Sequence, residues 1–136
     1  MSRKVAREVA MKLAFARLFG CDDTYAEVLE KSGIKDVPSE SDIEFAEALL
    51  QGINEKSEEI DALINEISYE WSAERMSRVD YSILRIAIYE ICYRDDIPDS
   101  VSINEAVELA KQFGGDQSPA FINGILGTVV KRLSSE

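Results

Sequence analysis

The segment Asp80–Arg94, with the sequence DYSILRIAIYEICYR, constrains the fold of this chain more than any other stretch. On a helix of about 3.6 residues per turn, its apolar residues cover nearly the whole circumference. A helix that is apolar on all sides has to be buried. With about fifteen residues and charges at Arg85 and Glu90, it is too short and too polar to span a membrane. We therefore predict a central helix that other helices surround.

Three charged residues, Asp80, Arg85 and Glu90, interrupt this apolar surface. Because an unpaired buried charge is costly, we expect each of them to reach a partner at the edge of the core. They could be structural ion pairs or functional groups, and the sequence leaves both interpretations open. The only tryptophan, Trp71, lies just before this segment and is interpreted as a core residue rather than as a base-stacking one.

The remaining patterns predict one all-α domain over residues 1–136, since prolines and glycines are few and alternating β-branched runs are scarce. Ser39 with Asp42, and Ser102 with Glu105, are typical of helix starts, and Ser118 before Pro119 predicts a further N-cap. Gly114 is expected to end a helix. The expected helices cover about 3–19, 24–31, 39–53, 60–67, 80–94, 102–113 and 118–133, and the sequence leaves open whether the third and fourth are continuous.

The chain contains no histidine and only two cysteines, Cys21 and Cys92. The absence of histidine excludes Ser-His and Cys-His nucleophile pairs and zinc sites that contain histidine. We therefore expect a binding protein with no enzyme activity, no metal and no cofactor. Two separate thiols without a secretory signal are typical of a reducing cytoplasm, and no segment predicts a membrane span.

The net charge of −11 is spread unevenly along the chain. Residues 1–20 carry five cations and one acid (+4), residues 21–70 three cations and fifteen acids (−12), and residues 71–136 seven cations and ten acids (−3). Such a division predicts a basic end for an anionic partner and an acidic body that repels nonspecific polyanions.

The first helix has two stripes at helical spacing. One is apolar and predicts a core face; it consists of Val5, Val9, Leu13 and Ala16. The other runs from cationic to apolar; it consists of Arg3, Lys4 and Arg7, followed by Met11, Phe15 and Leu18. The second stripe is either a solvated basic turn with a further packing contact, or a polyanion contact beside a protein-docking surface.

In the last helix, Phe121 flanks the predicted core face rather than filling it. An aromatic ring at that place could stack on a nucleobase. Gly124 and Gly127 leave a bare strip where another backbone or a ligand could approach closely. The alternative is a partly buried phenylalanine beside glycines that ease helix packing.

Three strings, DYSILRIAIYEI (80–91), IPDSVSINEAVELAKQFG (97–114) and SPAFINGIL (118–126), together with the opening RKVAREVAMKLAFA, resemble the NusB family of transcription antitermination factors. The resemblance implies an all-α fold of about seven helices in two sub-bundles. It implies a protein that binds the boxA element of ribosomal RNA transcripts together with NusE, a ribosomal protein, and joins elongating RNA polymerase with other Nus factors.

By position, the resemblance implies two sets of site residues. RNA contacts would come from Arg3, Lys4, Arg7, Gln117, Ser118, Phe121 and Asn123. The surface for NusE would come from Phe15, Leu18, Glu74, Asp80 and Glu90.

Two departures from the family pattern weaken the expected phosphate contacts: the basic segment is short, and Ala120 stands where some relatives have a cation. We therefore expect this chain alone to bind boxA weakly, with strong salt dependence. Two alternatives remain: a protein–protein adaptor of the same fold with little RNA affinity, and a homodimer formed through Met11, Phe15 and Leu18.

Overall fold

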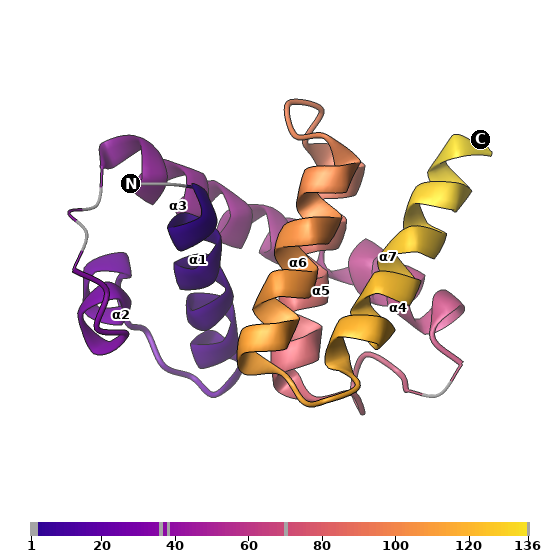
Figure 1. Ribbon diagram of the computed structural model, residues 1–136, viewed down its shortest axis with the longest axis horizontal. Coiled ribbons are helices and arrows are strands. Elements are labelled where there is room, and N and C mark those ends of the chain that lie inside the picture. The colour runs from indigo at the N-terminus through magenta and orange to yellow at the C-terminus, as the bar shows by residue number, and fades with distance from the viewer. Residues whose placement is uncertain (1–2, 36, 38, 70, 136) are drawn as a thin grey trace.

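The computed structural model describes residues 3–35, 37, 39–69 and 71–135, and within these ranges all regular secondary structure is helical (Figure 1). The helices are α1 (Arg3–Leu18), α2 (Tyr25–Lys31), α3 (Glu40–Glu55), α4 (Ser57–Ile67), α5 (Arg78–Tyr93), α6 (Asp99–Phe113) and α7 (Ser118–Ser134). None of these helices is long and apolar enough to span a membrane.

Helix α5 is the centre of the fold, as its apolar circumference predicts. It packs against α1 and α3 on one side and against α4, α6 and α7 on the other. Helix α2 packs on α1, and α7 packs on α6 and α4, which completes two groups of helices that share α5 (Figure 1). The prediction of an all-α fold with two sub-bundles around a buried central helix is confirmed.

The helix ends follow local side-chain chemistry. The Thr24 hydroxyl accepts from the backbone N–H of Glu27, whose carboxylate accepts from the Thr24 N–H, so α2 begins with a capping box. The Ser39 hydroxyl caps α3 in the predicted way, accepting from the N–H of Asp42. Lys56, which has non-helical backbone angles, separates α3 from α4.

Two predicted N-caps are wrong. Helix α6 begins at Asp99 after Pro98, and Ser102 lies inside it, buried, where its hydroxyl donates to Glu90. Helix α7 begins at Ser118 itself, and the Ser118 hydroxyl accepts from the N–H of Gly115 in the preceding loop. In both cases a tertiary or loop hydrogen bond takes the hydroxyl that the local sequence assigns to a cap.

Gly52 is required by packing inside α3, and this gives a prediction for stability. A Cβ added at Gly52 would overlap the aromatic ring of Tyr89 on α5. Although alanine is favoured over glycine in a helix by about 0.5–1 kcal/mol, we expect Gly52→Ala to lower the free energy of unfolding by about 1–3 kcal/mol through overpacking. Denaturant unfolding measures this change.

The matched control is Gly127→Ala on α7, because an added Cβ there has no neighbouring atom within 4 Å among the described residues. It should raise the free energy of unfolding by about 0.5–1 kcal/mol. Equal effects of the two substitutions would show that Tyr89 moves aside at no cost.

Candidate RNA and partner interface

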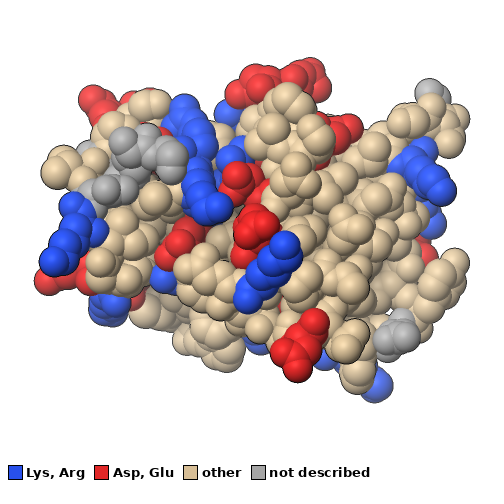
Figure 2. Space-filling view, viewed as in Figure 1, with Lys and Arg blue, Asp and Glu red and all other residues tan. Residues whose placement is uncertain are grey.

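The basic end of the chain is the first turn of α1, where Arg3 and Lys4 are exposed. The Arg3 guanidinium donates to the backbone oxygen of Ser41 (3.1 Å), to the Ser41 hydroxyl (3.2 Å) and to Asp42 Oδ1 (3.1 Å). It also lies 4.5 Å from the centroid of the Phe45 ring. Within the described ranges, Lys4 forms no ion pair. Figure 2 shows the basic side chains gathered over this end of α1.

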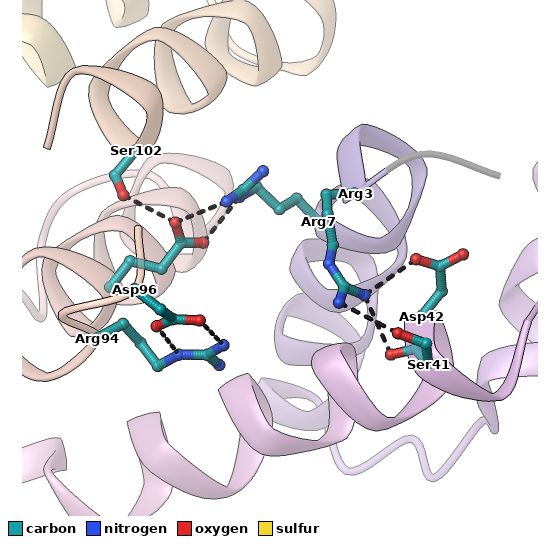
Figure 3. Close-up of polar contacts among 8 residues, drawn as sticks. Arg3, Arg7, Ser41, Asp42, Arg94, Asp96 and Ser102 are labelled. Carbon is teal, nitrogen blue, oxygen red and sulfur yellow. Dashed lines mark hydrogen bonds and ion pairs between the residues drawn. The ribbon is translucent and has the colours of Figure 1, made fainter. Parts of the chain in front are cut away.

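Arg7 does not belong to this exposed face, and its predicted position is wrong. It is 6% exposed and binds Glu90 of α5 through two hydrogen bonds, Nε to Oε2 (2.9 Å) and Nη2 to Oε1 (3.1 Å). Ser102 of α6 donates to the same carboxylate at 2.8 Å. Figure 3 shows this three-helix contact beside the Arg3 contact and the Arg94–Asp96 ion pair.

Glu90 and Met11 also lie elsewhere than predicted. Glu90 is 1% exposed and holds α1, α5 and α6 together, so it is part of the core and not of a partner surface. Met11 is buried in the hydrophobic core, which removes it from the proposed docking stripe. A helical wheel gives the side of α5 on which Glu90 lies and the side of α1 on which Met11 lies. It cannot show that neighbouring helices cover those positions.

Of the other predicted partner residues, Leu18 and Glu74 are exposed and Phe15 is half-buried. Phe15 packs against Phe19, with ring centroids 5.1 Å apart. Phe19 is 64% exposed, and the sequence pattern does not single it out because it falls at the end of the helical periodicity.

An open groove of about 1120 Å³ lies between the first turns of α7 and the segment that joins α4 to α5. Phe121 lines it, partly packed on the core. Trp71 and Tyr69 line the same groove and are 50% and 98% exposed, so the interpretation of Trp71 as a core residue is wrong. Gly124 adds a bare strip, since a Cβ added there would have no neighbouring atom within 4 Å among the described residues.

Asp80 lies at the edge of this groove with an unsatisfied carboxylate. It is largely buried, and its Oδ1 has no hydrogen-bond partner among the described residues. Such an atom normally finds a donor, because a buried acceptor without a partner costs about 1–3 kcal/mol. A hydrogen-bond donor on a bound molecule would satisfy this oxygen.

The remaining predicted RNA contacts sit around the start of α7. Gln117 and Asn123 are exposed, whereas Ser118 is buried and its hydroxyl is taken by Gly115. Helix α1 begins at the upper end of the molecule in Figure 1 and α7 begins at the lower end, with α6 between them in this view. The predicted RNA contacts on α1 and those around the start of α7 are therefore not one cluster. An RNA strand would have to extend along the molecule to contact both groups.

Residues 4–131 match the NusB family. The chain belongs to the NusB family.

The alignments with NusB relatives cover nearly the whole chain. The transcription antitermination protein NusB of Acetivibrio thermocellus is 46% identical over 131 residues, covering 96% of this chain and 90% of the relative. That of Geobacter sulfurreducens is 43% identical over 133 residues, covering 97% and 96%.

Solved NusB structures have the same fold. T. maritima NusB is 35% identical, with a TM-score of 0.82, and the match covers 96% of this chain and 92% of that one. A crystal structure of the antitermination factors NusB and NusE in complex with double-stranded RNA matches with a TM-score of 0.78 and 25% identity, covering 96% of both chains.

Tyr81 gives the NusB fold of this chain a measurable pH dependence. Burial, and a hydrogen bond donated to Asp61 Oδ1 (2.7 Å), raise the pKa of Tyr81 to about 12. The unfolded phenol has a pKa of about 10, so the folded state holds its proton longer. The contribution of Tyr81 to the free energy of unfolding is therefore fully present below pH ~10 and is lost as the pH rises toward ~12.

We therefore expect the free energy of unfolding to fall between about pH 10 and 11.5, and Tyr81→Phe to make this fall shallower. Urea unfolding across this pH range measures both slopes. Absorbance titration of the folded protein follows the deprotonation of its tyrosines. Compared with the wild type, the Tyr81→Phe variant should have one tyrosine fewer among those that deprotonate at the highest pH. Identical pH slopes for the two proteins would contradict the assignment to Tyr81.

Proposed function

We propose that this chain is a transcription antitermination factor that binds the boxA element of ribosomal RNA transcripts together with NusE and joins elongating RNA polymerase. The observation that carries the proposal is the exposed groove beside Phe121, which combines aromatic side chains with an unsatisfied acceptor at Asp80. The NusB–NusE–RNA structure, which matches nearly the whole chain, supports both partners.

In this proposal RNA bases stack on Phe121, because the flat face of an aromatic ring accepts any base. Gln117 and Asn123, both exposed near it in the chain, supply hydrogen bonds. Lys4 contacts phosphate from the start of α1, beside Arg3, whose guanidinium is paired with Asp42. Arg7 and Ser118 act indirectly, since Arg7 fixes α1 against α5 and Ser118 fixes the loop before α7.

NusE would bind Phe15 and Leu18 of α1 through their apolar side chains and Glu74, in the segment before α5, through its carboxylate. Phe19 extends the apolar part of this surface. A donor from NusE at Asp80 would satisfy the buried oxygen. Glu90 contributes only by holding the helices in place.

We propose that residues 1–136 act as one NusB-like RNA-binding domain, inside the cell, without catalysing a reaction. Contacts of α5 with five other helices support a single unit. Among the described residues, no group of three or more His, Cys, Asp or Glu side chains could hold a metal ion.

The test is a fluorescence-anisotropy titration of boxA RNA with this protein, with and without NusE, at two salt concentrations. We expect weak binding by the chain alone, tighter binding with NusE, loss of binding on scrambling the RNA, and weaker binding at higher salt because counterions are released at each phosphate contact. Equal affinity with and without NusE would contradict the expected division of the RNA surface.

A specific observation supports the alternative of a protein–protein adaptor with little RNA affinity. The chain has a net charge of −11, and of the three predicted cations only Lys4 forms no ion pair among the described residues. NusE binding without a boxA-specific signal would favour this adaptor.

A homodimer is the other alternative. Its predicted interface now consists of Phe15 and Leu18, because Met11 is buried. Light scattering of Phe15→Asp tests it, since an unchanged dimer mass would reject this surface.

A further inference from the structure

The first turns of α3 form a cradle for the Arg3 guanidinium. Asp42 and Phe45 are three residues apart on the helix, so their side chains face the same side. They give Arg3 one carboxylate oxygen and one aromatic face. Ser41 adds its backbone oxygen and its hydroxyl, and Figure 3 shows the contacts of Arg3 with Ser41 and Asp42. Arg94 and Arg7 lie over the same Phe45 ring, each 5.2 Å from its centroid, with Asp96 and Glu90 as their own partners.

The carboxylate in this cradle is held in place independently of Arg3. Asp42 Oδ2 accepts a hydrogen bond of 2.8 Å from the Ser39 hydroxyl, and Asp42 lies in the first turn of α3, where the helix dipole favours a negative charge. The side chain of Asp42 is 6% exposed, whereas that of Arg3 is 47% exposed. A phosphate can therefore approach Arg3 from solvent, but it meets a cation that a fixed carboxylate already neutralises.

We propose that Asp42 competes with RNA phosphate for Arg3 and thereby limits the RNA affinity of this chain. This inference rests on the proposed RNA binding. Carboxylate and phosphate are both anions that a guanidinium binds through its N–H groups. Asp42 accepts one hydrogen bond from Arg3 Nη1, so a phosphate at Arg3 competes with Asp42 for the same positive charge. When RNA binds, Arg3 has two options. If it moves to the phosphate, the buried Asp42 carboxylate loses its counter-charge; if it stays with Asp42, it contributes little to phosphate binding.

The test is the substitution Asp42→Asn, measured by anisotropy with boxA RNA in the presence of NusE over a series of salt concentrations. One extra phosphate contact on a single strand steepens the slope of log K against log salt by about 0.7, which is about fivefold in affinity at ~0.1 M salt. We therefore expect tighter binding by about this factor and a slope steeper by about this amount.

Glu40→Gln is the matched control, because Glu40 is exposed in the same first turn of α3 and contacts no cation among the described residues. It removes the same charge, so an equal gain from both variants would be a general charge effect and would overturn the proposal. Weaker RNA binding by Asp42→Asn would overturn it too, because Asp42 would then position Arg3 for RNA rather than compete.

A double-mutant cycle assigns the gain to Arg3. Arg3→Gln alone should change affinity by less than about twofold, whereas in the Asp42→Asn background it should remove the whole gain of about fivefold and restore the original slope. Circular dichroism and thermal unfolding verify the fold, and Asp42→Ser is the second variant if the amide disturbs the Ser39 cap. No boxA binding by any of these proteins with NusE would reject the proposed function itself, whereas binding that is unchanged in Asp42→Asn would reject only the role of Asp42.

Discussion

Replacing Glu90 by alanine is expected to lower the free energy of unfolding by about 3–5 kcal/mol, because it leaves a buried arginine without its counter-charge. Arg7 makes both of its described hydrogen bonds to this carboxylate and is itself buried. The Ser102 hydroxyl would lose its acceptor in the same substitution. Three helices meet at this group, so the loss cannot be confined to one of them.

Asp96→Ala provides the matched control. Asp96 also binds an arginine through two hydrogen bonds of 2.9 Å, but its side chain is 65% exposed. An ion pair at the surface contributes about 0–1 kcal/mol, although the Arg94 guanidinium lowers the pKa of Asp96 to about 2. Urea unfolding at neutral pH compares the two variants, and similar losses would mean that solvent reaches Arg7 when Glu90 is removed.

Phe121→Ala is expected to weaken boxA binding in the presence of NusE by about 5- to 150-fold, since one stacked base contributes about 1–3 kcal/mol. The ring lines the open groove and is only partly buried against the core, so a base in the groove can contact it. Anisotropy titration with boxA RNA measures the change.

Phe121→Leu separates stacking from packing, because leucine keeps an apolar side chain at the core edge but has no aromatic face. It should bind RNA almost as weakly as Phe121→Ala while unfolding at nearly the wild-type temperature. Tyr93→Ala removes an exposed ring that does not line the groove and should leave RNA affinity unchanged. Full affinity in Phe121→Leu would assign Phe121 to packing alone.

Most of the architecture could be predicted from local patterns. The apolar circumference of residues 80–94 predicts a central helix, and α5 is that helix, displaced by two residues at its start and by one at its end. Ser39 and Gly114 mark helix ends because capping depends on groups within one turn of each other. The resemblance to the NusB family supplied the two sub-bundles, which no periodicity encodes.

The site could be predicted only in part. Lys4, Gln117 and Asn123 are exposed as expected, because each lies at a helix start or on the outer face of a helix. Trp71 lies in a non-helical segment, so no periodicity could indicate that half of it would be exposed in a groove.

Local patterns are enough to specify a helical protein with an apolar central helix, a basic start and family-specific motifs, because these depend on residues within a few turns of each other. Which of the charges stay available for a partner depends instead on how the helices pack. Arg7 and Glu90 are 83 residues apart in sequence and become one buried ion pair, while Arg3 is taken by Asp42, 39 residues away. A helical wheel shows on which side of a helix a charge lies, but a charge is neutralised by whatever another helix brings within hydrogen-bond distance.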